Sequence, residues 1–259
     1  MAERLCGRPL LLLLDVDGTL SPIAPRPDYA TIPIETRDVV LDLAALPNTS
    51  VALISGRSAT DARRMLGSDD TWVIGNHGIE LAAPHAGAAT RGDVEKFSSA
   101  IVAARDRCSA IAASFPGVVV EDKRWTLSVH HRLAHPQVVP QLVVDVGAVA
   151  ADLGLRMTRG KEVLELRPPV QIDKGTASVE LAGRLGALDF GASILCAGDD
   201  RTDEDAFAAI RAAQPRSVTV RVGPDWNTSP SAAEYGARDP AEFRLMLEEI
   251  VELRGGARR

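Results

Sequence analysis

The sequence lacks an apolar run long enough to cross a membrane. Its most regular apolar stretch is the five leucines Leu10–Leu14, whereas a transmembrane helix needs roughly 20 apolar residues. The stretch is also too short for the apolar part of a secretory signal, which spans about 7–15 residues, and it ends in Asp15-Val16-Asp17 rather than in small residues. We therefore expect a cytoplasmic protein with no membrane segment and no signal peptide.

Cysteine is scarce. The chain has three cysteines, Cys6, Cys108 and Cys196, and none of them stands in the Cys-x-x-Cys spacing of metal and redox sites. Cys108 and Cys196 fall within apolar patterns. We interpret all three as reduced core residues, which agrees with a cytoplasmic location.

Basic residues are outnumbered by acidic ones, 29 to 35, and the formal net charge is -6. General binding to nucleic acid or to anionic membranes depends on clustered lysine and arginine. This balance excludes both as general partners. An anionic ligand must therefore be bound by a local basic cluster.

A short apolar run is followed by two carboxylates at the start of the chain. Leu10–Leu14 suits a strand buried on both faces, and Asp15 and Asp17 come where that strand ends. Ligands of open parallel sheets bind beyond the carboxyl ends of the strands. The two carboxylates are therefore placed to hold one hard cation together, or to divide the roles of nucleophile and acid.

The same arrangement recurs along the chain. Runs at 51–54, 72–74 and 193–197 also end in small or polar residues, and helical stretches alternate with them. Such alternation is typical of a parallel α/β sheet. The residues after these runs are Ser55-Gly56-Arg57, Gly75-Asn76-His77-Gly78 and Gly198-Asp199-Asp200.

The middle of the chain has a different pattern. Apolar residues recur every three or four positions over 93–115 and again over 138–153, which predicts two helices. Each is followed by a short hairpin pattern, at 118–131 and at 155–166. We therefore predict two domains, a core of 1–86 and 170–259 and an inserted α+β cap of 87–169.

Several of these residues have both a functional and a structural interpretation. The Asp15-x-Asp17-Gly18 sequence does not fit a calcium loop, because the glycine is fourth rather than sixth and no glutamate follows at position twelve. Ser55 and the amide of Gly56 could bind phosphate or could cap a helix. Lys174 opens a helix, where the dipole does not favour a cation, so we expect an anionic partner for it. The acidic group Asp199, Asp200 and Asp203 could cap a helix or complete a magnesium site.

Taken in order, these motifs resemble those of the haloacid dehalogenase-like phosphohydrolases. The resemblance covers about two thirds of the chain and implies a Rossmann-like core with a cap inserted between the second and third motifs. The cap sequences resemble those of trehalose-6-phosphate phosphatases more closely, with one departure at His131, where that family has Tyr. The residues that carry this closer resemblance are Glu121-Asp122-Lys123, His130-His131-Arg132, Gly160-Lys161, Glu165–Pro168, Gly75–Gly78 and Gly198–Phe207.

The resemblance also implies roles for the core residues. Asp15 would be the nucleophile that forms an aspartyl-phosphate, and Asp17 would be the acid and base. Mg²⁺ would be held by Asp15, the backbone carbonyl of Asp17 and Asp199. The resemblance further implies phosphate binding by Ser55, Gly56 and Lys174, and orientation of the site by Asp200 and Asp203.

In the cap, the resemblance implies a set of sugar-binding side chains. They are Glu121, Lys123, Arg132, Lys161 and Glu165, with Asn76 of the core as a further substrate contact. Without the resemblance, salt bridges across a solvated hairpin face would explain the cap residues equally well.

The expected function is Mg²⁺-dependent hydrolysis of trehalose 6-phosphate in trehalose biosynthesis. The alternatives are a phosphatase of another disaccharide or pseudo-disaccharide phosphate, such as sucrose 6-phosphate, a phosphosugar mutase, and a non-catalytic sugar-phosphate sensor. The short segments at the two ends suggest a chain that acts alone as a monomer on a small sugar phosphate.

Overall fold

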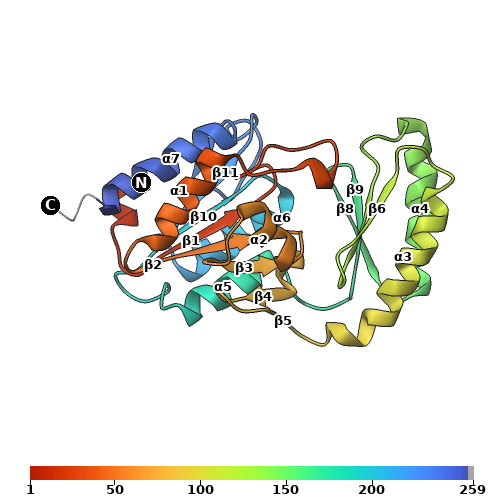
Figure 1. Ribbon diagram of the computed structural model, residues 1–259, viewed down its shortest axis with the longest axis horizontal. Coiled ribbons are helices and arrows are strands. Elements are labelled where there is room, and N and C mark those ends of the chain that lie inside the picture. The colour runs from red at the N-terminus through yellow and green to blue at the C-terminus, as the bar shows by residue number, and fades with distance from the viewer. Residues whose placement is uncertain (256–259) are drawn as a thin grey trace. The chain divides into compact units, whose positions relative to one another are not determined.

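The computed structural model describes residues 1–255, and the chain divides into two compact units (Figure 1). The sheet unit combines Met1–Ala89 with Ile172–Arg259, and the insert unit is Thr90–Gln171. The last four residues of the predicted core domain, 256–259, lie outside the described residues.

A mixed sheet forms the centre of the sheet unit, with the strand order β12-β11-β10-β1-β2-β3-β4-β5. The strands from β12 to β3 run parallel, as the alternating pattern predicts. The predicted parallel sheet is confirmed, and one antiparallel strand extends it, since β4 pairs antiparallel with β3 after a tight turn. The strands are β1 (Leu10–Asp15), β2 (Thr49–Ile54), β3 (Trp72–Gly75), β4 (Glu80–Ala82), β5 (Ala88–Thr90), β10 (Ser193–Gly198), β11 (Val218–Val222) and β12 (Tyr235–Ala237).

The leucines of β1 join two hydrophobic cores, one on each face of the sheet. Side chains of a strand alternate between its faces, so Leu10, Leu12 and Leu14 pack in one core, and Leu11 and Leu13 pack in the other. The first core also receives α1 (Ile34–Ala45), α2 (Ala59–Leu66) and α7 (Pro240–Gly255), and the second receives α5 (Lys174–Arg184) and α6 (Arg201–Ala213). Residues 10–14 of β1 are therefore all apolar because helices cover both faces of the sheet.

The strand register brings the polar strand ends to one edge of this sheet. β1 lies between β10 and β2, with Leu14 opposite Ala197 and Asp15 opposite Ile54. The residues that follow the three strands therefore emerge side by side. They include Asp17, Ser55 and Asp199.

An antiparallel sheet covered by two helices forms the insert unit. Its strands are ordered β6-β7-β9-β8, and leucines and valines of β7 and β9 pack against α3 and α4 in a core of their own. The predicted helix at 93–115 is a 3-10 turn, η4 (Val94–Phe97), followed by a shorter α-helix, because Phe97 leaves the α-helical conformation with φ -101° and ψ 4°. The elements are α3 (Ser98–Ala112), β6 (Val119–Asp122), β7 (Leu127–His130), α4 (Val139–Asp152), β8 (Arg156–Gly160) and β9 (Val163–Arg167).

Short 3-10 turns complete the fold. The structure places them at η1 (Ala2–Leu5), η2 (Pro27–Tyr29), η3 (Asn76–Gly78) and η5 (Pro136–Val138). Cys6 follows η1 and is exposed, so its interpretation as a core residue is wrong, whereas Cys108 and Cys196 are buried free thiols. Over residues 1–255, no helix combines the length and the apolar character that crossing a bilayer requires.

Candidate active site

Lys174 contacts two carboxylates at the polar edge of the sheet. Its Nζ lies 2.8 Å from Oδ1 of Asp15 and 2.8 Å from Oδ1 of Asp203. All three side chains are buried. Lys174 is the first residue of α5, and the capping box of Asp173 and Thr176 starts that helix without using it. The expectation that an anionic partner holds this lysine is confirmed.

The same three groups perturb one another electrostatically. Burial raises the pKa of Asp15 to about 8, and the charges of Asp199 and Asp200 act in the same direction, while Lys174 opposes them. Burial disfavours the Lys174 ammonium, but Asp15 and Asp203 outweigh it and hold the pKa of Lys174 well above its ordinary value. The site therefore concentrates more negative charge than one lysine neutralises, and a bound cation would stabilise the ionised form of Asp15.

The acidic turn after β10 is built by helix capping. Asp200 is the N-cap of α6 and accepts hydrogen bonds from the amides of Thr202 and Asp203. Asp203 in turn accepts from the amides of Asp199 and Asp200 over 3.0 and 3.1 Å. The capping interpretation therefore holds for Asp200 and Asp203.

Asp199 lies directly against the turn that follows β1. A Cβ on Gly18 would overlap the Asp199 carboxylate, and Gly18 has a φ of +87°, which a side chain rarely adopts. Glycine at this position therefore lets the acidic group after β10 approach the one after β1.

An all-oxygen donor set results. Asp15, Asp199 and Asp203 each offer a carboxylate oxygen within 4.8 Å of the others. Hard oxygen donors suit Mg²⁺, so these residues fit the metal that the sequence resemblance implies. The carboxylate of Asp17 is not part of this donor set, and both of its oxygens accept hydrogen bonds from Arg57.

The loop between β2 and α2 carries Ser55 and Gly56. Ser58, and not Ser55, is the N-cap of α2, and its hydroxyl accepts from the amide of Asp61. The capping interpretation of Ser55 is therefore wrong. Ser55 Oγ instead accepts from the amide of Arg57 over 3.1 Å.

The turn η3 holds this loop in place. The amide of His77 donates to the carbonyl of Ser55 over 3.0 Å, and the amide of Asn76 donates to that of Arg57 over 2.7 Å. The ring of His77 occupies the space that a side chain on Gly56 would need. Asn76 and His77 both have left-handed backbones, with φ of 48° and 55°, and strain of this kind concentrates at functional sites. Asn76, predicted to contact substrate, is buried in this turn.

Three of the predicted sugar-binding residues gather on one face of the insert sheet. Lys123 Nζ lies 3.7 Å from Glu121 and 3.8 Å from Glu165. Ser128 stands opposite Glu121 on one side and opposite Glu165 on the other, which puts the two glutamates on the same face. Arg132 pairs with Glu162 over 2.6 Å, and Lys161 lies exposed in the turn after β8.

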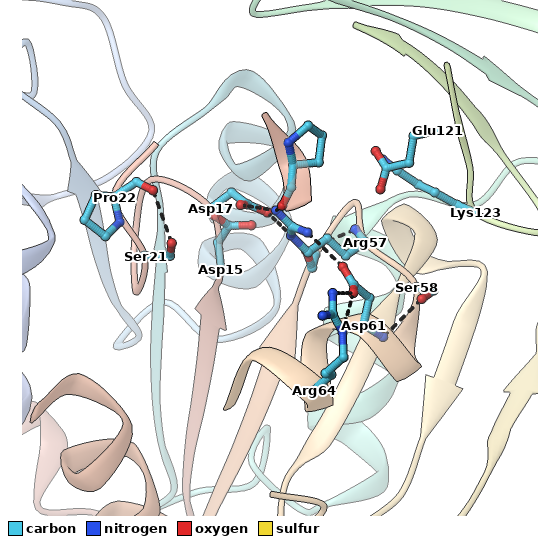
Figure 2. Close-up of polar contacts among 12 residues, drawn as sticks. Asp15, Asp17, Ser21, Pro22, Arg57, Ser58, Asp61, Arg64, Glu121 and Lys123 are labelled. Atoms are coloured by element: carbon cyan, nitrogen blue, oxygen red, sulfur yellow. Dashed lines mark hydrogen bonds and ion pairs between the residues drawn. The ribbon is translucent and has the colours of Figure 1, made fainter. Parts of the chain in front are cut away.

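Three polar side chains were missed by the sequence analysis. Arg57 binds Asp17 in the sheet unit, as Figure 2 shows. In the insert unit, Arg167 pairs with Glu165, and His130 Nε2 lies 2.8 Å from Glu121. The signal for Arg57 was its position directly after Ser55-Gly56 at a strand end, whereas His130 and Arg167 stood within the motifs that carried the resemblance.

Comparison with known proteins gives one family. Residues 13–241 match the family model described as trehalose-phosphatase. The chain is 34% identical over 253 residues to a trehalose-phosphate phosphatase of Mycobacterium avium, covering 97% of this chain and 64% of that protein. It is 39% identical over 214 residues to an uncharacterized glycosyl hydrolase of Mycobacterium tuberculosis, covering 80% of this chain and 16% of that protein. The chain thus spans less than two thirds of the length of these relatives.

Among solved structures, the fold is similar to a trehalose-6-phosphate phosphatase related protein. The TM-score is 0.83 at 25% sequence identity, and the match covers 96% of this chain and 100% of the other. The matched residues therefore include both the sheet unit and the insert unit.

Proposed function

The chain belongs to the trehalose-phosphatase family, and on that premise we propose that it hydrolyses trehalose 6-phosphate to trehalose and phosphate. The observation that supports this most directly is the contact of Lys174 with Asp15 and Asp203 beside Asp199. A buried lysine is suited to bind a negatively charged phosphoryl group. The carboxylates that converge around it are suited to bind a divalent cation.

In the first half of the reaction, a carboxylate oxygen of Asp15 attacks phosphorus. The bond between phosphorus and the sugar oxygen breaks, and Asp17 gives its proton to the departing oxygen. In the second half, Asp17 takes a proton from a water molecule that attacks the aspartyl-phosphate, which releases phosphate and restores Asp15. The net change is hydrolysis of one phosphate ester.

The surrounding residues stabilise charge. Ser55, the amide of Gly56 and Lys174 bind the non-bridging phosphoryl oxygens, where charge accumulates in the transition state. Asp15, Asp199 and the carbonyl of Asp17 would hold Mg²⁺, which would supply charge neutralisation between the nucleophile and the phosphate. Asp203 keeps Lys174 and the turn after β10 in position, as its contacts with Lys174 and two amides support.

We assign sugar recognition to the polar face of the insert sheet. Glu121, Lys123 and Glu165 provide charged donors and acceptors there. Arg132 and Lys161 of the same unit complete this set, and Asn76 of the sheet unit is proposed separately as a substrate contact. A site that pairs with many hydroxyls discriminates strongly, because a wrong sugar leaves charged groups unpaired.

The biological setting follows from the substrate. We place the activity in trehalose biosynthesis and in the cytoplasm, which the three free cysteines support. The prediction of a monomer is tested by light scattering on a sizing column.

A phosphate-release assay tests the function. We expect turnover of trehalose 6-phosphate with Mg²⁺, loss of turnover with EDTA, recovery when Mg²⁺ is returned, and no turnover by Asp15→Asn. Glucose 6-phosphate and sucrose 6-phosphate serve as competing substrates. Preference for another sugar phosphate would reassign the substrate, and binding without phosphate release would indicate a sensor. Full activity of Asp15→Asn would refute the nucleophile assignment.

A further inference from the structure

Arg57 holds both oxygens of the Asp17 carboxylate. Its Nε donates to Oδ2 over 2.6 Å and its Nη2 donates to Oδ1 over 2.8 Å, a two-point contact that Figure 2 shows. Arg57 and Asp17 are 40 positions apart in the chain. A guanidinium bound to a carboxylate at two points fixes its orientation as well as its position.

Other contacts anchor the guanidinium itself. Nη1 donates to Asp61 Oδ2 over 2.7 Å, and Nη2 also donates to the carbonyl of Pro27 over 3.1 Å. Arg57 is only 6% exposed, and its backbone is bonded to Ser55 and Asn76. Burial opposes its charge, but the hydrogen bonds that Arg57 donates to the carboxylates of Asp17 and Asp61 outweigh this and raise the pKa of Arg57 above its ordinary range.

Asp17 is the less constrained partner of the two. Its side chain is 35% exposed, whereas that of Arg57 is 7% exposed. The loop that follows it turns at Gly18. The orientation of the Asp17 carboxylate therefore depends on the guanidinium, which several elements hold in place.

We propose that Arg57 is a positioning residue that orients the Asp17 carboxylate for proton transfer. The inference rests on the proposed function, in which Asp17 protonates the departing sugar oxygen. A proton donor must lie within hydrogen-bond reach of its acceptor. A misplacement of about 1 Å can reduce the rate of such a step by about 100-fold.

Arg57 could instead be needed only to hold the loop of Pro27 and the start of α2 in place. That role predicts equal loss on every substrate. A role through Asp17 predicts a loss that depends on whether the leaving group needs a proton. A sugar alkoxide needs one, whereas p-nitrophenolate leaves without it.

The test compares Arg57→Ala, Asp17→Asn and the double variant in single-turnover release of the leaving group. We expect Arg57→Ala to slow release of trehalose about 100-fold and to change release of p-nitrophenolate from p-nitrophenyl phosphate less than about fivefold. In the Asp17→Asn background, Arg57→Ala should cost no further factor, because two residues that act through one step are not additive. Guanidinium ions added to Arg57→Ala should restore part of the rate.

Arg64→Ala is the matched control. Arg64 also contacts Asp61, with its Nε 3.1 Å from Oδ1, but from an exposed position. We expect wild-type rates from it. Arg57→Lys keeps the charge and protects the fold if Arg57→Ala is unstable, and it should show the same substrate dependence because an ammonium cannot bind at two points.

Equal losses on both substrates, or losses that multiply with those of Asp17→Asn, would overturn the inference and leave the proposed function intact. A wild-type protein that hydrolyses neither phosphate ester would reject the proposed function, and the role of Arg57 with it.

Discussion

The Nζ of Lys174 lies 2.8 Å from Oδ1 of Asp15, so the first residue of α5 contacts the last residue of β1. The two are 159 positions apart in the chain. Asp203, on α6, accepts a second hydrogen bond from the Nζ of Lys174. One cation thus joins three elements at the edge of the sheet.

Removal of that cation should destabilise the fold. Lys174→Met leaves the buried carboxylates of Asp15 and Asp203 without a counter-charge, which should lower the free energy of unfolding by about 3–5 kcal/mol. Urea denaturation measures it. The control is Lys96→Met, which removes an exposed pair with Asp93 and should change stability by less than about 0.5 kcal/mol. Equal losses of unfolding free energy in the two variants would show that the buried Lys174 contacts stabilise the fold no more than an exposed ion pair does.

Gly18→Ala should weaken metal binding. The new Cβ overlaps the Asp199 carboxylate and displaces it from Asp15. We expect the Mg²⁺ concentration for half-maximal activity to rise at least tenfold. Gly191→Ala is the control, because its φ of +86° matches the +87° of Gly18 while no atom lies within 4 Å of the new Cβ. Both variants should lose about 1–2 kcal/mol from the left-handed backbone. An unchanged Mg²⁺ requirement in Gly18→Ala would contradict the placement of Asp199 at the metal.

Glu165→Ala should reduce discrimination between sugar phosphates. Glu165 contacts Lys123 and Arg167 on the polar face of the insert sheet. Loss of a charged hydrogen-bonding group, worth about 1.5–3 kcal/mol, should lower the preference for trehalose 6-phosphate over glucose 6-phosphate by about 10- to 100-fold in kcat/KM. Asp152→Ala removes an exposed carboxylate that pairs with Arg107 in the same unit and should leave the preference unchanged. A preserved preference in Glu165→Ala would remove Glu165 from the sugar site.

Alkylation should distinguish the cysteines. Burial raises the pKa of the Cys108 thiol to about 11 and raises that of Cys196 further, so neither forms appreciable thiolate near pH 8. Cys6 is exposed. Iodoacetamide at pH 8 should therefore add one group to the folded protein, on Cys6, and three to the protein in urea. Mass spectrometry counts the adducts, and rapid labelling of Cys196 in the folded protein would be inconsistent with its buried position.

Local patterns were sufficient for much of the fold. Leu10–Leu14 predicted a strand buried on both faces, because the leucines alternate between two helical layers. The spacing of apolar residues also predicted both helices of the insert unit. The short strands β4, β5 and β12 were missed, since three residues carry too little periodicity. The 3-10 turn at Val94–Phe97 was included in the helix predicted at 93–115, because its apolar residues continue the same spacing.

For the site, the residue pattern was sufficient to predict which side chains follow each strand and that Lys174 needs an anionic partner. Which of these groups meet depends on how the strands and helices pack. The packing of α5 against one face of β1 brings Lys174 to Asp15, and the pairing of β1 with β2 places Arg57 within reach of Asp17. The physical reason is that strand neighbours are chosen by packing across the whole sheet, whereas sequence patterns report only which residues a strand buries and where it ends.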